Sequence, residues 1–331
     1  MKTIGLLLCA LQVAWPQESP RFSSNVQLVM VDVQVTEKGT GRVLDLLGPK
    51  DFELYDNGNQ QNIREFHFET TTLDLVFLKY GHLGWGTPKE INEFRRGLTE
   101  AVDELRSGDR AAVFRTDSES EIDLPISEDR EKVRHALVFG DRRYRAGYKG
   151  HLYDATRVAT TLFAKPKDPA RRRAIIVITD DIERGSKIKV DPLIEVLLEA
   201  DATLNEIITA FPGGSRQIRT AGLPPWKGPL GIPDVTHRIG SQPMGASLRP
   251  AVQATGGEAV PGDLFRGRFP ELIRRIRLRY LLGFYAEPAT AREFHNIEVR
   301  LAPQAKTQYP SALVRARRGY YSEPASSTGG R

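Results

Sequence analysis

At 331 residues the chain is long enough for two domains of ordinary size and for a substantial core. Hydrophobic residues make up 40% of it and charged residues 27%, proportions that exclude a disordered chain and an integral membrane protein. The formal charge of +5 is spread over short clusters, so it indicates weak attraction to anionic surfaces and gives no reason to expect a nucleic-acid partner.

The first 20 residues have the pattern of a secretory signal peptide. A positive charge at Lys2 precedes an apolar stretch from Ile4 to about Ala14, which is too short to span a bilayer. We therefore expect an exported protein, periplasmic or extracellular; the alternative is a short buried helix or strand. Cys9 is the single cysteine, and bulky Leu8 before it argues against a lipid anchor. Removal of the signal would leave no disulfide, thiolate metal site or cysteine nucleophile.

Residues 25 to 70 predict a small β module. Alternating and β-branched side chains from Val26 to Val35 indicate a strand. Further along, Asn57-Gly58 lies between two apolar runs, which is a strong signal for a hairpin turn.

Residues 71 to 262 predict an α/β domain, because apolar strands alternate with amphipathic helices. Strands are expected at 73–78, 110–116, 173–181 and 203–211, and helices at 88–109, 127–139, 151–164 and 191–202. Ser127 is the expected opening residue of the second helix. This alternation implies right-handed crossovers and a doubly wound, mainly parallel sheet with helices on both faces.

Three further segments complete the chain. Residues 212–245 are rich in glycine and proline and have no usable period, so we expect a long loop that is functional or mobile. Residues 263–322 predict one helix and then β strands, which we expect to pack on the N-terminal module because two or three strands are not stable alone. The tail at 323–331 is expected to be disordered.

Several phrases in fixed order resemble a known family. VDVQV, GPKDFELYDNGNQQNI, LRSGDRAAVF, LYDAT, IIVITDD, YLLGFY and VRARRGYY together resemble bacterial exported proteins built around a von Willebrand factor A-related domain. The match covers residues 25 to 322, and the order and spacing of the phrases are more specific than any one of them. The resemblance implies a Rossmann-like A domain that binds a protein partner outside the cytoplasm, without catalysis.

In that family the A domain commonly carries a metal-ion-dependent adhesion site: Asp-x-Ser-x-Ser after the first central strand, a threonine before a helix, and an aspartate ending a later strand. Such oxygens suit Mg²⁺, which requires near-octahedral oxygen ligands. The corresponding positions here are Lys79, Gly81, Leu83, His151 and Asp180. Only Asp180 keeps the family's residue type, so the resemblance implies a degenerate site without a metal or other cofactor.

Lys79 and Asp180 would both lie at the carboxyl edge of adjacent strands, where open α/β sheets bind their ligands. We therefore hypothesise that the ammonium of Lys79 neutralises Asp180 in place of a cation. A separation well beyond about 6 Å would contradict this pairing.

Aromatic and basic residues near the same edge predict a partner-binding surface, because interface hot spots are rich in Trp, Tyr and Arg. The candidates are Tyr80, Trp85, Arg143, Tyr144, Arg145 and Trp226. The stretch 142–149 could also contact an anionic envelope surface. The alternative for the aromatics is core or loop packing, and the sequence leaves the partner and the oligomeric state open.

An acidic set gives a competing hypothesis. Asp154, Asp180, Asp181 and Glu183 could bind Ca²⁺ if their loops converge, and His151 could transfer protons in a hydrolase-like site. The alternative is a solvated strand end beside a surface histidine. The sequence contains neither a G-x-S-x-G elbow nor an H-E-x-x-H motif, so we expect no enzyme unless these groups meet in one pocket.

Overall fold

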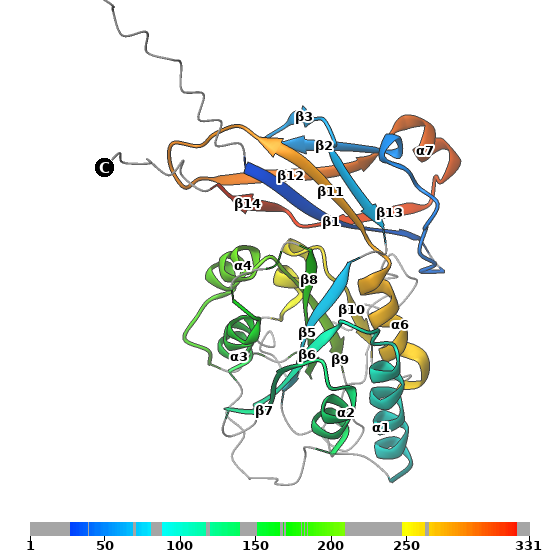
Figure 1. Cartoon of the computed structure of the whole chain (residues 1–331), viewed down its shortest axis with the longest axis vertical. Coiled ribbons are helices and arrows are strands. Elements are labelled where there is room, and N and C mark those ends of the chain that lie inside the picture. Colours follow the sequence, from blue (N-terminus) through cyan, green and yellow to red (C-terminus); the bar gives the residue numbers. More distant parts are fainter. Residues whose placement is uncertain are drawn as a thin grey trace, which may run out of the picture.

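The computed structural model describes residues 27–38, 40–68, 71–80, 88–116, 120–139, 151–165, 168, 170–179, 181, 183, 185–208, 247–261 and 265–322. A β sandwich and an α/β domain follow one another along the long axis of the molecule (Figure 1). The predicted signal peptide, the predicted loop at 212–245 and the tail at 323–331 lie outside the described residues.

The α/β domain is built on a six-stranded sheet in the order β10-β9-β8-β5-β6-β7. Its strands are β5 (Thr72–Tyr80), β6 (Arg110–Thr116), β7 (Ser120–Ser127), β8 (Arg171–Thr179), β9 (Ala202–Ile208) and β10 (Ala259–Pro261). All described pairings in it are parallel except that of β6 with β7. The predicted α/β class with a mainly parallel sheet is confirmed. The strand order reverses between β5 and β8, which makes this the switch point of a doubly wound sheet.

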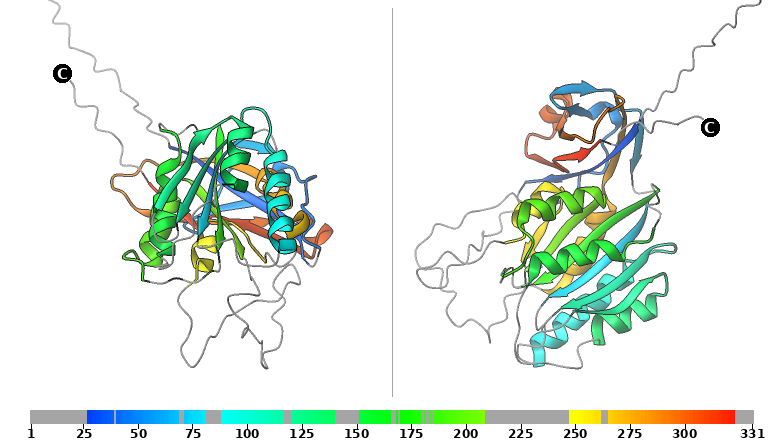
Figure 2. Two further views of the ribbon diagram at one scale, coloured as in Figure 1. Left: turned by 90° about the horizontal axis from the view of Figure 1, so that it is seen from below. Right: turned by 90° about the vertical axis from the view of Figure 1, so that its left-hand side faces the viewer.

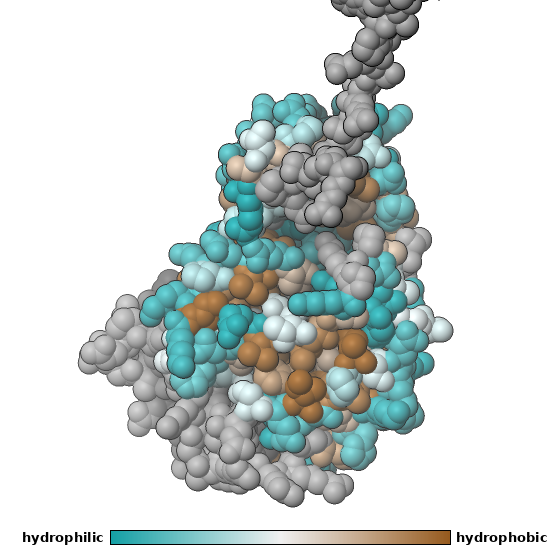
Figure 3. Space-filling model, turned by 60° about the vertical axis from the view of Figure 1, so that its left-hand side comes forward, coloured by the Kyte–Doolittle hydropathy of each residue, from teal (hydrophilic) through white to brown (hydrophobic). Residues whose placement is uncertain are grey.

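Helices cover both faces of this sheet (Figure 2). One face carries α1 (Pro88–Asp103), α2 (Arg130–Phe139) and α6 (Phe265–Arg277), and the other carries α3 (Leu152–Ala159), η2 (Thr160–Leu162), α4 (Val190–Glu199) and α5 (Arg249–Ala254). Alternate residues of β5 enter the two cores, Leu75 and Phe77 on the first face and Val76 and Leu78 on the second. Burial on both faces explains the continuous apolar run of this strand. On the side of α3 and α4, some apolar side chains remain exposed among hydrophilic ones (Figure 3).

The sandwich combines strands from both ends of the chain. Its sheets have the orders β13-β1-β11-β4 and β14-β12-β2-β3. The elements are β1 (Gln27–Glu37), η1 (Pro49–Asp51), β2 (Phe52–Asp56), β3 (Asn59–Gln61), β4 (Glu65–Phe68), β11 (Tyr280–Ala286), β12 (Phe294–Leu301), α7 (Pro303–Gln308), β13 (Ala312–Ala316) and β14 (Gly319–Tyr321). Strand β1 pairs with β11 on one side and β13 on the other, and a shared apolar core fills the space between the sheets.

The hairpin predicted at Asn57-Gly58 is confirmed. Both residues have positive φ, 49° and 81°, and they connect the antiparallel strands β2 and β3. Positive φ at both central positions is the geometry of a type I′ turn, which Asn-Gly adopts at low cost.

The predicted start of α2 is wrong. The helix begins at Arg130, and the carboxylate of Asp129 accepts the backbone N–H groups of Glu131 and Lys132 at 3.1 Å each. Ser127 instead ends β7, and its hydroxyl accepts the N–H of Asp129. An aspartate satisfies the free amides of a first turn as well as serine does, and its charge favours the helix N-terminus.

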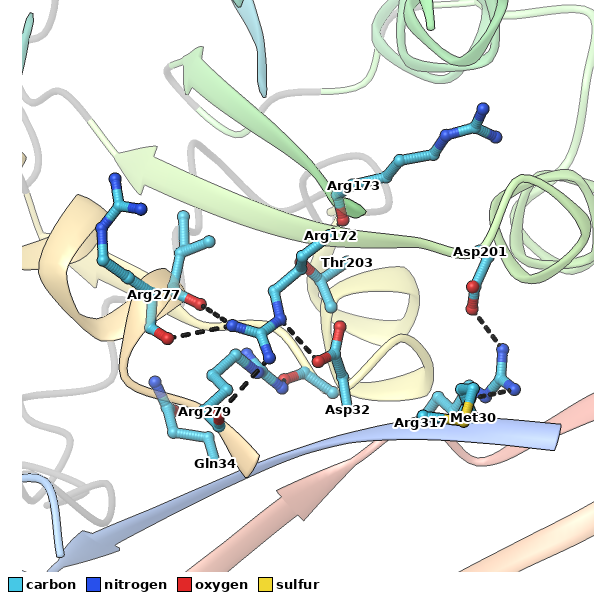
Figure 4. A network of polar contacts seen from close by, with 12 residues as sticks. Met30, Asp32, Gln34, Arg172, Arg173, Asp201, Thr203, Arg277, Arg279 and Arg317 are labelled. Atoms are coloured by element: carbon cyan, nitrogen blue, oxygen red, sulfur yellow. Dashed lines mark hydrogen bonds and ion pairs between the residues drawn. The ribbon is translucent and has the colours of Figure 1, made fainter. Parts of the chain in front are cut away.

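The sandwich covers the amino ends of the parallel strands. Arg172, at the amino end of β8, forms an ion pair of 2.6 Å with Asp32 of β1 and donates to the carbonyls of Ile276 and Arg277 at the end of α6 (Figure 4). Arg317 adds a second contact to the α/β domain through Asp201. The carboxyl ends of β5 and β8 therefore point away from the sandwich.

Candidate binding edge of the α/β sheet

Lys79 lies near the carboxyl end of β5, at the switch point, and its side chain is 1% exposed. Its Nζ is 3.1 Å from Oδ2 of Asp123 on β7, a contact that is an ion pair without hydrogen-bond geometry. The same ammonium donates to the carbonyl oxygen of Ala136 on α2 at 3.1 Å. The end of β5 thus holds a buried cation with a carboxylate beside it.

Asp123 reaches this position through a β-bulge. In the pairing of β6 with β7, Val113 lies opposite Leu124 and the next residue, Phe114, lies opposite Ile122. Asp123 is therefore the extra residue between them. A bulge redirects the side chain of its extra residue, and here it brings the Asp123 carboxylate to the ammonium.

A second cation binds the same carboxylate. Arg115 lies beside Lys79 in the register of β5 and β6, and its Nη2 is 3.2 Å from Oδ1 of Asp123 and 2.6 Å from Oε2 of Glu121. Burial opposes the charge of Arg115, but hydrogen bonds and charge from Asp123 and Glu121 raise the pKa of its guanidinium above its ordinary value. Opposite charges alternate along the network, which makes burial of its members tolerable.

Sequence reasoning missed Asp123. The hypothesised partner of Lys79, Asp180, lies outside the described residues, so that pairing stays a prediction. The alternating apolar residues Ile122, Leu124 and Ile126 were the signal that could have revealed β7 and its carboxylate.

An open groove of about 540 Å³ lies beside this network, between β7 and α2. Its lining residues are Glu121, Ile122, Asp123, Leu124, Asp129, Glu131, Lys132, His135 and Ala136. Two groups that Lys79 contacts, the Asp123 carboxylate and the Ala136 carbonyl, belong to residues that line the groove, one on each wall. A single buried side chain therefore connects its two walls.

His151 and Asp154 take structural roles around α3. The imidazole Nδ1 of His151 is 2.8 Å from the carbonyl oxygen of Gly185. The carboxylate of Asp154 accepts the backbone N–H groups of Lys187 at 2.9 Å and Ile188 at 3.2 Å. These contacts hold the segment before α4 against the beginning of α3.

Glu183 and Asp181, in the loop after β8, also take structural roles. Glu183 accepts the N–H of Tyr153 at 3.0 Å and both the N–H and the hydroxyl of Ser186, at 2.6 and 2.8 Å. Asp181 accepts the N–H of Leu248 at 2.9 Å. Each of these carboxylates binds backbone amides. Across the described ranges, no group of three or more His, Cys, Asp or Glu side chains is arranged to hold a metal ion.

The predicted partner-binding residues divide into two groups. Tyr80 is 2% exposed and packs in the core beneath α3 and α4, so its prediction as an exposed aromatic is wrong. Side chains alternate between the two faces of a strand, and the even-numbered residues of β5 face that core. The other candidates, Trp85, Arg143, Tyr144, Arg145 and Trp226, and the metal-site positions Gly81 and Leu83, lie outside the described residues.

Comparisons with known proteins find no matching family model and no matching curated protein. Among solved structures, an aerotolerance-related membrane protein from Bacteroides fragilis is 16% identical, covering 62% of this chain and 98% of that chain, with a TM-score of 0.42. BatB from Bacteroides thetaiotaomicron, a conserved hypothetical protein, is 17% identical over 62% and 97% of the two chains, also with a TM-score of 0.42. Proximal thread matrix protein 1 from the mussel byssus is 10% identical over 67% and 50%, with a TM-score of 0.45.

These are distant likenesses, and no function follows from them. Within the part of the chain that is described, no helix is both long and apolar enough to cross a membrane.

Proposed function

We propose that this chain is a non-catalytic, extracytoplasmic protein-interaction module of the von Willebrand factor A type, acting in adhesion or as a scaffold without a metal ion. The observation that carries the proposal is Lys79. A buried ammonium with its own carboxylate occupies the position where the resembled family places the first aspartate of its metal site. The ordered sequence phrases and the switch point at β5 and β8 support the A-type assignment.

Electrostatics supports metal independence. Two like unit charges about 4 Å apart repel by roughly 4 kcal/mol where the effective dielectric constant is near 20. A divalent cation beside Lys79 would meet that repulsion and would compete with Lys79 and Arg115 for Asp123. The ammonium of Lys79 therefore supplies the positive charge that a bound metal ion would supply.

The alternative of a hydrolase-like or Ca²⁺-binding site is less well supported. Asp154, Asp181 and Glu183 each use carboxylate oxygens to accept backbone N–H groups, and His151 contacts a carbonyl. Hydrogen bonds of this kind stabilise the conformation of loops. A general acid or base must instead reach a substrate proton.

The experiment is a pull-down with the tagged mature chain from the native envelope fraction, with and without EDTA, followed by a binding measurement on each purified captured protein. We expect saturable binding of a protein partner that EDTA does not change. Capture that disappears in EDTA would contradict metal independence. The absence of any saturable protein partner would contradict the proposed function itself.

A further inference from the structure

Within the described residues, strand β7 lies at the edge of the six-stranded sheet. It pairs with β6, and no strand among the described residues pairs with its other side. Such an edge presents backbone N–H and C=O groups to which an extended chain can add as a further strand. Pro125 has no N–H to donate, which restricts an added strand to the part of β7 before this residue.

That part of β7 lines the groove, from Glu121 to Leu124. Ile122 is 50% exposed, so an apolar side chain is ready to be covered at this point. A volume of about 540 Å³ lies within the range of roughly 300 to 1,000 Å³ that is typical of binding pockets. The open edge, the exposed isoleucine and the groove therefore coincide.

The groove is acidic although the whole chain has a formal charge of +5. The carboxylates of Glu121, Asp129 and Glu131 line it with 66%, 43% and 79% of their side-chain surfaces exposed. Each has an ion-pair partner, but two of these partners, Arg115 and Arg134, lie outside the lining and are only 14% and 21% exposed. Lys132 is the exposed cation among the lining residues. Charge complementarity thus favours a basic occupant.

The walls of the groove are fixed in advance. Lys79 is paired with Asp123 on β7 and donates to Ala136 on α2, so the two walls are connected before any ligand arrives. A preformed site avoids part of the ordering cost that a flexible surface would incur on binding.

We propose that this groove binds an extended, basic segment of the partner protein, which adds a short strand to β7 and covers Ile122. This inference rests on the proposed function and assigns its binding surface. Alternate residues of the added strand point to opposite sides, so lysine or arginine side chains face the carboxylates while the intervening apolar residues contact Ile122.

The test uses synthetic peptides of about ten residues that alternate lysine with valine or threonine, a length sufficient for one strand. Two further versions of the lysine peptide are N-methylated, one on the odd-numbered amides and the other on the even-numbered amides. Alternate N–H groups of a strand point to opposite edges, so each version loses the N–H donors of one edge and keeps every side chain. A third peptide replaces lysine by glutamate. Binding to the mature chain is measured by calorimetry, and hydrogen exchange follows the amides of residues 120–127.

We expect the lysine peptide to bind and to protect amides in β7, with one N-methylated isomer and the glutamate peptide weaker by about tenfold or more. Ile122→Lys and Glu131→Lys should weaken binding to a similar extent. The matched controls Leu28→Lys and Glu298→Lys alter an exposed apolar and an exposed acidic residue of the sandwich, and should leave binding unchanged.

The inference is overturned if no peptide binds, if both N-methylated isomers bind as well as their parent, or if Ile122→Lys binds as tightly as the natural chain. A concentration-dependent dimer that Ile122→Lys dissociates would also overturn it, because the edge would then be occupied by a second copy. If Ile122→Lys still captures the envelope partner, the surface is wrong while the proposed function stands.

Discussion

Lys79 is a buried cation near the carboxyl end of β5. The ammonium is buried, and it contacts a carboxylate on β7 and a carbonyl on α2. A buried charge is tolerated only with partners, so Lys79 and Asp123 depend on one another. Lys79 therefore links the two walls of the neighbouring groove.

Replacing this ammonium by an apolar group tests its structural role. Lys79→Met keeps most of the side-chain volume but leaves Asp123 with Arg115 alone, and we expect a loss of about 3 kcal/mol in the free energy of unfolding. Urea denaturation measures it. Lys306→Met on exposed α7 is the control and should change stability by less than about 0.5 kcal/mol. If Lys79→Met were as stable as the natural chain, the Lys79 ammonium would not be needed to stabilise the buried Asp123 carboxylate.

Asp74 gives a prediction about pH. Burial raises the pKa of its carboxyl, but the guanidinium groups of Arg110 and Arg171, at 2.7 Å each, outweigh burial and hold the pKa below its ordinary value. A depressed pKa means that Asp74 stabilises the fold above the pKa of the unfolded chain, about 3.9, and that this stability is lost as the pH falls through the folded pKa.

We therefore expect Asp74→Asn to reduce the free energy of unfolding at neutral pH, with a difference from the natural chain that shrinks below about pH 4. Urea titrations across this pH range measure the difference. A difference that stays constant with pH would show that the Asp74 carboxylate contributes no pH-dependent stability.

Among the helices and strands, the sequence predicted the buried central strands of the α/β sheet and missed its edge strand β7. Strands β5 and β8 were found because both of their faces are buried and their residues are continuously apolar. Strand β7 was not predicted, because it is an edge strand with polar and exposed residues and a proline. The site depends on both kinds of strand. Lys79 was therefore identified by resemblance, while its carboxylate partner required the structure.

The start of α2 offers a test at the same scale. Because Asp129 accepts two amides of the first turn, Asp129→Ala should cost about 1 kcal/mol of stability. Ser127→Ala, which removes one hydroxyl outside the helix, should cost clearly less. Thermal unfolding of both variants distinguishes them, and a larger loss for Ser127→Ala would restore serine as the cap.

At the scale of the whole molecule, two arginines join the two domains: Arg172 at the amino end of β8 and Arg317 of the sandwich. Arg172 is almost completely buried and binds Asp32 of the sandwich as well as the carbonyl groups that end α6. The chain itself crosses between the domains from β4 to β5 and from α6 to β11. With this arrangement the carboxyl ends of β5 and β8 lie at the end of the α/β domain away from the sandwich (Figure 1). Arginines far apart in sequence from their partners gave no pattern that could have predicted it.

Arg172→Lys keeps the charge but loses the planar group that bonds several acceptors at once. We expect it to weaken the contact between the domains by about 3 kcal/mol and to separate calorimetric unfolding into two transitions. Arg300→Lys, at an exposed pair with Glu298, is the matched control and should behave as the natural chain does. One unchanged transition in Arg172→Lys would show that other contacts hold the domains together.

Thermal unfolding in millimolar Mg²⁺ and in EDTA tests whether Lys79 takes the place of a metal ion. An ion that binds only the folded state raises the unfolding temperature. We expect the same unfolding temperature for the natural chain in both solutions, and a lower temperature for Lys79→Met that is also independent of Mg²⁺. A natural chain that is stabilised by several degrees in Mg²⁺ would contradict it.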